Sequence, residues 1–193
     1  GYGCNDGVKK AYKDKTGNVG EINLMLTAML RFAGLNANPV LISTRDNGIA
    51  LFPSRTAFNH VIAAVEIPEG NLLLDATEKY AGYNVLPFND LNWIGRLIGK
   101  DGTSEEIDLM PKKISNDVIT MNYSIDSKGL ISGKLRRQLT DYNALAFRNK
   151  VEDVKEDIYL ENLENEYEKI EIKDYSRSND KNLKLPVTET FSF

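Results

Sequence analysis

One segment near the start of the chain has the pattern of a buried helix, and it constrains the fold more than any other stretch. Its apolar residues recur at three-and-four spacing: Ile22, Met25, Leu26, Met29, Leu30 and Ala33. Asn18 stands where an N-terminal cap belongs, Glu21 falls in the first turn, and Gly34 stands where a left-handed residue ends a helix. The sequence therefore predicts a core helix that begins at Val19 and ends before Gly34.

The residues after this helix read as strands. Residues 39–45, 58–67 and 72–77 are strand-like, and the middle run is apolar on both faces. We therefore expect an antiparallel sheet packed against the core helix. A short surface helix is predicted over residues 6–15, and Trp93 is expected to be a packing anchor.

The pattern changes near residues 110–113, where we place a domain boundary. Beyond it, residues 118–125 and 130–139 alternate around a turn at Lys128-Gly129, which predicts a hairpin. A helical stretch follows, capped by Asp141 and running to about Glu166 with one break in the middle. Further strands are expected at residues 167–174 and 183–193, on either side of a polar turn.

The predicted fold class is accordingly α+β, in two domains. Residues 1–112 form a helix packed on an antiparallel sheet, and residues 113–193 form a smaller β-rich domain with an inserted helix. The chain begins with Gly and stops inside an alternating segment. We therefore expect a fragment of a longer protein, in which the first domain lacks its N-terminal part and the second its C-terminal part.

Composition excludes several functional classes. The chain has 193 residues, 41% hydrophobic and 27% charged, which is typical of a folded globular protein. The net charge of −4 and the lack of a basic stripe argue against nucleic acid as a partner. The longest apolar stretch is too short to span a membrane. Cys4 and His60 are the only residues of their types, so we expect no internal disulfide, no metal site and no cofactor.

Three short motifs in the first half occur in an informative order. Residues 17–21 read Gly-Asn-Val-Gly-Glu at the start of the core helix, residues 58–62 read Phe-Asn-His-Val-Ile, and residues 73–77 read Leu-Leu-Asp-Ala-Thr. If the hairpin turns at residues 68–69, His60 and Asp75 become diagonal neighbours on one side of the sheet. Their side chains then come close enough to meet, whereas a turn one residue later would separate them by two further positions.

These motifs resemble the transglutaminase-like, papain-type cysteine enzyme superfamily over roughly residues 15–100. That family has a Cys at the N-terminus of a core helix, a His on a following strand, and an Asp on the next strand, often as Asp-x-Thr. The resemblance assigns these three positions to Val19, His60 and Asp75. The second half resembles a β-rich domain of unknown function that follows this core in exported bacterial proteins, especially from Bacteroidetes. The resemblance implies a periplasmic or cell-surface location.

Val19 cannot act as a nucleophile, because its side chain has neither a proton to lose nor a lone pair with which to attack. The resemblance therefore implies a non-catalytic module of a larger exported protein, in which Val19, His60 and Asp75 are relics. Taken singly, His60 also fits a satisfied core histidine, and Asp75 fits a carboxylate at a strand end.

Three functions stay open from the sequence. The first is a binding or scaffolding module that contacts other domains of the parent chain, a peptide or a glycan, with Tyr80, Tyr83 and Trp93 as candidate ligand contacts. The second is an active thiol hydrolase or acyltransferase that uses Cys4 with His60 and Asp75. The third is a purely structural spacer.

Overall fold

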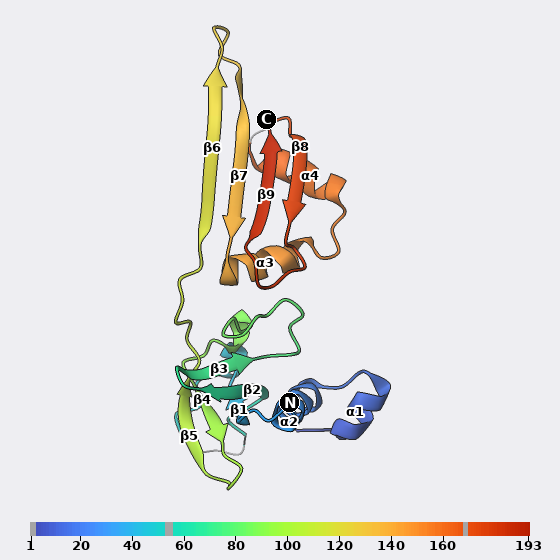
Figure 1. Ribbon diagram of the computed structural model, residues 1–193, viewed down its shortest axis with the longest axis vertical. Helices are drawn as coiled ribbons and strands as arrows, with labels where there is room; N and C mark the ends of the chain where they lie inside the picture. The colour runs from blue at the N-terminus through green and yellow to red at the C-terminus, as the bar shows by residue number, and fades with distance from the viewer. Residues whose placement is uncertain (1–2, 53–55, 168–169) are drawn as a thin grey trace. The chain divides into compact units, whose positions relative to one another are not determined.

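The computed structural model describes residues 3–52, 56–167 and 170–193, and the chain divides into two compact units. The first unit is Gly1–Lys112 and the second is Lys113–Phe193 (Figure 1). Each contains an antiparallel sheet with helices, so the predicted α+β class is confirmed. No helix in the described part of the chain is long and apolar enough to cross a membrane.

The first unit packs two helices and a five-stranded sheet. The helices are α1 (Val8–Asp14) and α2 (Val19–Phe32), and the strand order in the sheet is β3-β2-β1-β4-β5. The strands are β1 (Ala37–Ile42), β2 (His60–Ile67), β3 (Gly70–Leu74), β4 (Ile94–Ile98) and β5 (Ser104–Asp108), with short 3₁₀ turns η1 (Arg45–Asn47) and η2 (Phe88–Asp90). Residues 61–65 of β2 are all buried, as their continuous apolar run predicts.

Two expectations about the first unit need correction. The predicted sheet of three strands is too small, because it lacks β4 and β5, which were not predicted from the sequence. Trp93 is not a packing anchor, because its side chain is 52% exposed. It instead precedes β4 with a positive φ of 67°, and its carbonyl accepts the N–H of Leu109.

Helix α2 begins and ends where the sequence predicts. The Asn18 side chain accepts the Glu21 N–H, and the Glu21 side chain accepts the Asn18 N–H, which together make a complete capping box. At the other end Gly34 adopts a φ of 84°, the left-handed conformation that glycine tolerates best. Local chemistry therefore sets both ends of this helix.

The buried face of α2 is not the apolar stripe that the sequence predicts. Its buried residues are small or polar: Gly20, Glu21, Asn23 and Thr27. Met29 is 56% exposed, and it lies with Met25 and Phe32 along an open groove of about 560 Å³ shared with α1. Asn23 and Thr27 can face the interior because each finds hydrogen-bond partners there.

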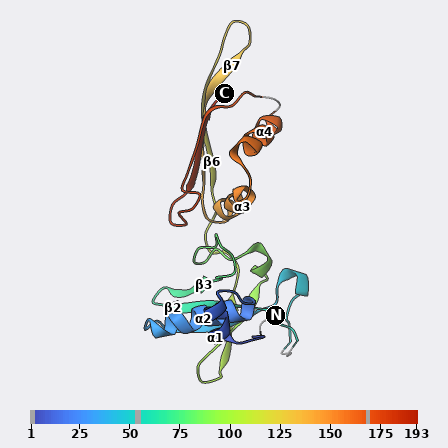
Figure 2. The same ribbon diagram turned by 90° about the vertical axis from the view of Figure 1, so that its right-hand side faces the viewer.

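The second unit is a four-stranded antiparallel sheet with two helices on one face (Figure 2). The strand order is β6-β7-β9-β8, with β6 (Asp117–Ile125), β7 (Ile131–Leu139), β8 (Lys173–Ser178) and β9 (Val187–Ser192). Helices α3 (Asp141–Val151) and α4 (Glu156–Glu166) follow the β6–β7 hairpin. The core between helices and sheet is mainly apolar: Leu135, Leu139, Ala144, Phe147, Val151, Tyr159, Leu163, Val187 and Phe191.

Several boundaries in the second unit differ from the prediction. The helical stretch is divided into α3 and α4, at the break that the pattern indicates, and Thr140 rather than Asp141 is the N-terminal cap residue. Strand β8 begins at Lys173, later than predicted, and runs into the expected polar turn; residues 168–169 of that predicted strand lie outside the described residues. Strand β9 is also shorter than its predicted run.

Candidate functional site

The hairpin of β2 and β3 brings His60 and Asp75 together. Ile67 pairs with Gly70 and Ala63 with Leu74, so the turn lies at residues 68–69. This is the register that makes His60 and Asp75 diagonal neighbours. His60 Nε2 lies 2.9 Å from Asp75 Oδ2, the length of a charge-assisted hydrogen bond. The structure therefore places both side chains on one side of the sheet.

Asp75 is fixed by hydrogen bonds on its other oxygen. Asp75 Oδ1 accepts the Thr77 N–H at 2.8 Å, the Thr77 hydroxyl at 2.6 Å and the Asn23 side-chain amide at 2.8 Å. The two contacts from Thr77 are local and follow from the Asp-x-Thr spacing. Asp75 therefore accepts three donors on Oδ1 while Oδ2 is directed at the imidazole.

Asn23 connects α2 to this pair and was not foreseen as a site residue. Its amide nitrogen also donates to the Val61 carbonyl at 2.9 Å, and its oxygen accepts the Ala76 N–H at 2.8 Å. The side chain is fully buried. In the sequence Asn23 only interrupts an apolar run, and a polar residue inside such a run is the one signal that could have drawn attention to it.

Asp90 is the second unforeseen member of the cluster. It lies in η2, only 2% exposed, with its Oδ2 3.5 Å from His60 Nε2. This oxygen is buried and has no hydrogen-bond partner in the described part of the chain. No sequence motif near Asp90 identifies it as a site residue, because its position beside His60 depends on the path that residues 75–90 follow in the folded unit.

The charge states of the cluster follow from burial and contact. Burial opposes ionisation of Asp75, but hydrogen bonds from His60, Asn23 and Thr77 outweigh it and hold its pKa well below the usual range. Burial and the neighbouring Asp75 carboxylate raise the pKa of Asp90 to about 7, against the opposing charge of His60. Burial opposes protonation of His60, but the Asp75 hydrogen bond and both carboxylates raise its pKa overall.

We expect the stability of the chain to fall as pH rises from 5 to 8. Folded Asp90 retains its proton up to about pH 7, whereas an unfolded aspartate loses it near pH 4, so its stabilisation is lost across that interval. The raised pKa of His60 acts in the same direction above pH 6.5. The combined loss in unfolding free energy should be on the order of 2 kcal/mol, since each pKa unit corresponds to about 1.4 kcal/mol. Urea denaturation at pH 5, 6, 7 and 8 measures it.

Asp90→Asn separates the two contributions. It should remove the part of the pH dependence due to Asp90 and reduce the part due to His60, because the Asp90 carboxylate also helps to raise the pKa of His60. Asp14→Asn, at an exposed position at the end of α1, is the matched control and should retain the full dependence. A stability that is constant or rises between pH 5 and pH 8 in the unmodified chain would contradict this assignment of charges.

Val19 is the first residue of α2, where the resemblance requires a thiol. It precedes Asn23 by four residues, so the two side chains lie on the same helical face one turn apart. Asn23 contacts Asp75, and Asp75 contacts His60. The start of α2 therefore faces the His60–Asp75 side of the sheet, with a side chain that has no acid–base or nucleophilic chemistry.

Cys4 also lies near the start of α2, although it is exposed. Its neighbours hold it there: the Gly3 carbonyl accepts the Asn18 side-chain amide, and the Asp6 N–H donates to Glu21. Burial and the charge of Glu21 raise the pKa of the Cys4 thiol. A raised pKa keeps the thiol protonated at neutral pH and works against nucleophilic activation.

The His60 side chain is largely covered. Only 14% of its side chain is exposed, and the carboxylates of Asp75 and Asp90 occupy the side of Nε2. Of the candidate ligand contacts, Tyr80 is buried, whereas Tyr83 and Trp93 are exposed. The three aromatic side chains therefore do not share one environment, and Tyr80 cannot contact a ligand without a rearrangement.

The same cluster is the arrangement nearest to a metal site among the described residues. His60, Asp75 and Asp90 each offer one ligand atom, and these atoms lie within 4.8 Å of one another. The 2.9 Å contact between His60 Nε2 and Asp75 Oδ2 has the length of a hydrogen bond, so a proton on Nε2 accounts for it. The cluster is therefore a hydrogen-bonded His–carboxylate group.

Comparison of the chain with known proteins yields no relative. No family model matches it, and neither a curated protein nor a solved structure is significantly similar to it. The functional interpretation therefore depends on the geometry of the site.

Proposed function

We propose that the chain is a non-catalytic module of the transglutaminase-like type with a binding or scaffolding role in a larger exported protein. The observation that carries this proposal is the combination of an intact His60–Asp75 pair with Val19 at the helix start. In a thiol enzyme the carboxylate orients the imidazole and the imidazole activates the nucleophile. Here the first two members are in position and the third is chemically inert.

The retained pair has a structural use that does not require catalysis. Asn23 from α2 donates to Asp75 and to the β2 backbone, and it accepts from Ala76 beyond β3. These contacts join the helix to β2 and to the residues that follow β3 through polar groups, whose loss would leave unpaired atoms in the interior. The former site thereby acts as an internal link of the first unit.

An exposed apolar groove favours a binding role over a mere spacer. It is the groove of about 560 Å³ between α1 and α2, lined by Val8, Lys9, Tyr12, Met25, Ala28, Met29 and Phe32. Phe32 is almost fully exposed, and Tyr12 is largely so. Exposed apolar residues gathered in this way are typical of contact surfaces. Under this proposal the partners are other domains of the parent chain or a peptide or glycan, in the periplasmic or cell-surface location implied by the resemblance.

The alternative of a thiol enzyme based on Cys4 makes a different prediction about reactivity. If Cys4 is not activated, its rate of alkylation by iodoacetamide near neutral pH should be that of an ordinary exposed thiol. The alkylation rate of Cys4 should change less than twofold in His60→Gln, because a thiol that the imidazole does not activate is unaffected by its removal. The unmodified chain should also show no peptidase, amidase or transglutaminase turnover.

The test uses variants that retain hydrogen-bonding capacity. Far-UV circular dichroism first establishes that His60→Gln is folded, and Asp14→Asn provides the matched control for an exposed site. Turnover that disappears in Cys4→Ser, or a Cys4 alkylation rate that drops tenfold in His60→Gln, would overturn the proposal in favour of the thiol enzyme.

A further inference from the structure

Strand β6 is an unusual edge strand. It lies at one end of the sheet order β6-β7-β9-β8, and all nine of its residues are exposed (Figure 1). Its only charged residue is Asp117 at the first position, which is bound by Arg137. The following eight residues, 118–125, contain no charge, no proline and no glycine. They therefore form a long, uncharged strand with one side open.

The other sheet edges differ from β6. β8 carries Lys173, Asp174 and Arg177, and its register with β9 is irregular. In the first unit β5 carries three acidic residues, and β3 has only five residues. Charges, irregular register and short length are the devices by which proteins keep sheet edges from pairing with other chains. β6 has none of them along residues 118–125.

The backbone groups at the open side of β6 can be identified. Gly133 of β7 exchanges both of its backbone hydrogen bonds with Phe193, so it faces β9. Its partner in β6, Tyr123, consequently faces away from β7, because the side to which backbone groups point alternates along a strand. Within residues 118–125, four residues present their N–H and C=O groups to the open edge: Ile119, Met121, Tyr123 and Ile125.

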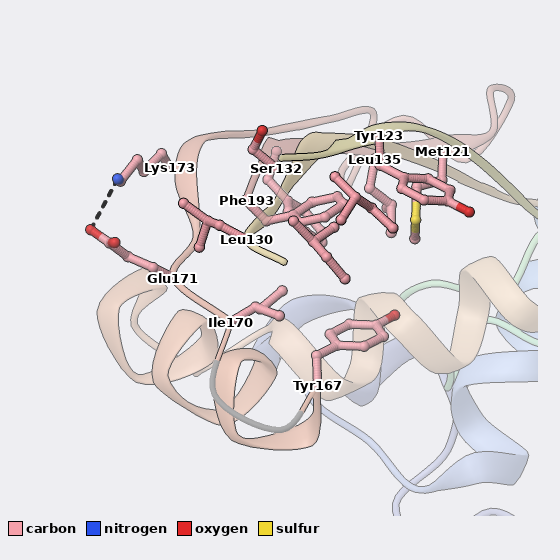
Figure 3. Close-up of a pocket in the computed structure, with 13 residues that line it drawn as sticks. Met121, Tyr123, Leu130, Ser132, Leu135, Tyr167, Ile170, Glu171, Lys173 and Phe193 are labelled. Atoms are coloured by element: carbon pink, nitrogen blue, oxygen red, sulfur yellow. Dashed lines mark ion pairs between the residues drawn. The ribbon is translucent and has the colours of Figure 1, made fainter. Parts of the chain in front are cut away.

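The side chains of the same four residues lie on the helix side of the sheet. Met121 pairs with Leu135, which belongs to the core of the second unit, and every second residue of β6 shares that face. Met121, Tyr123 and Ile125 line an open apolar groove of about 860 Å³ that Leu130, Phe193 and Ile170 also line (Figure 3). The apolar surface of the core thus continues to the open edge without a cover.

We propose that β6 pairs with β6 of a second copy of this chain, as antiparallel neighbours about a two-fold axis at Asn122. In this register Ile119 lies opposite Ile125, and Met121 lies opposite Tyr123. These are the residues whose backbone groups point outward, so each pair can exchange two hydrogen bonds. The two sheets then form one sheet of eight strands.

This pairing is complementary in charge and in side-chain type. Within residues 118–125 no like charges meet, because the strand is uncharged, and Asp126 lies opposite Val118. On the helix side, aliphatic residues face aliphatic or aromatic ones, and on the other side Thr120 faces Ser124. Cross-strand pairs of these kinds stabilise antiparallel sheets. A second copy offers the same backbone groups and side chains in reverse order, as a two-fold contact requires.

Sedimentation equilibrium of the full 193-residue chain tests the proposal. A single edge contact is a small interface, so we expect a reversible dimer that is populated at about 100 µM and dissociates on dilution. Met121→Pro removes an outward N–H without removing a bond to β7, and proline is tolerated at such edge positions. It should weaken dimerisation at least tenfold. Met121→Ala keeps the N–H and should weaken it less.

A cross-link provides an independent measurement. In a Cys4→Ser background, Asn122→Cys places two thiols opposite each other at a non-hydrogen-bonded position, where Cα atoms are about 4.5 Å apart. It should form a disulfide-linked dimer under mild oxidation. Ser124→Cys is the matched control, because its two copies would lie four residues apart, about 13 Å along the strands, and should not cross-link.

Each outcome decides the proposal. A dimer that Met121→Pro dissociates, or a selective cross-link at position 122, supports it; the cross-link also decides the matter if Met121→Pro fails to fold. A chain that stays monomeric at about 100 µM and does not cross-link at position 122 would refute it, and would leave the edge to a strand from a different protein. Equal cross-linking at positions 122 and 124 would also overturn it. None of these results depends on the catalytic state of the first unit.

Discussion

Replacing Glu189 by alanine is expected to destabilise the second unit by about 3–5 kcal/mol, because it removes two hydrogen bonds to a carboxylate, each of which contributes about 1.5–3 kcal/mol. Glu189 is only 2% exposed, in the middle of β9. Its Oε1 accepts the hydroxyls of Tyr159 and Tyr175, each at 2.7 Å. Without this acceptor, the hydroxyls of buried Tyr159 and partly buried Tyr175 would lose their partner.

Two arginines flank Glu189 on the neighbouring strands. In the strand register, Arg137 of β7 lies opposite Glu189 on one side and Arg177 of β8 lies opposite it on the other. Burial and the hydrogen bonds to Glu189 raise the pKa of both tyrosines, so their hydroxyls remain donors at all ordinary pH values. Removing the carboxylate would therefore also take away the negative charge that lies between these two arginines, although Arg137 keeps Asp117 and Arg177 keeps Asp180 as a partner.

Urea denaturation, read together with amide hydrogen exchange of the β9 segment, measures this effect in the unit concerned. Glu189→Gln keeps an oxygen acceptor and should cost less than half as much as alanine. Glu171→Ala, at an exposed glutamate in the same unit, should change the free energy of unfolding by less than about 0.5 kcal/mol. A loss of less than 1 kcal/mol in Glu189→Ala would mean that the tyrosines find other partners, contrary to the network described.

Replacing Val19 by cysteine should create a thiol that reacts with alkylating agents at least tenfold faster than Cys4 near neutral pH. The first turn of α2 places this position at the positive end of the helix dipole. Asn23 lies one turn further along α2, where it donates to Asp75, and Asp75 in turn contacts His60. A helix N-terminus and a protonated imidazole both lower the pKa of a thiol, and each unit of lowering raises the thiolate fraction about tenfold.

The measurement is the rate of iodoacetamide alkylation as a function of pH. The new thiol is studied in a Cys4→Ser background, and its rate should persist at pH 6, where Cys4 in the unmodified chain has become slow. Adding His60→Gln should remove part of the acceleration and leave the part due to the helix. A thiol at position 19 that reacts no faster than Cys4 would mean that the start of α2 is not the relic of a nucleophile site. Turnover need not return, because rate also depends on substrate positioning.

Local chemistry explains why parts of the fold could be predicted from the sequence. The capping box of Asn18 with Glu21, and the left-handed Gly34, fix the ends of α2 through groups within four residues of each other. The register of the β2–β3 hairpin follows from a short turn and from the apolar run of β2. That register was sufficient to predict contact between His60 and Asp75.

The errors occurred where burial depends on distant partners. The apolar stripe of α2 was expected to face the sheet, but the buried side carries Asn23 and Thr27. A hydrophobic pattern assumes that polar side chains avoid the interior, and that assumption fails where a buried acceptor such as Asp75 offers a hydrogen bond. β4 and β5 were missed for a related reason, since β4 is placed by pairing with β1.

The sequence by itself therefore determined the α+β class and the capped helix, because these follow from short-range periodicity and capping chemistry. It predicted contact between His60 and Asp75 for one of two possible hairpin registers, and the structure has that register. Only the tertiary structure decided that Asn23 and Asp90 complete the cluster and that Asp90 is buried. Asn23 and Asp75 are 52 residues apart. Contacts over that separation are selected by the packing of the whole unit, and no local pattern encodes them.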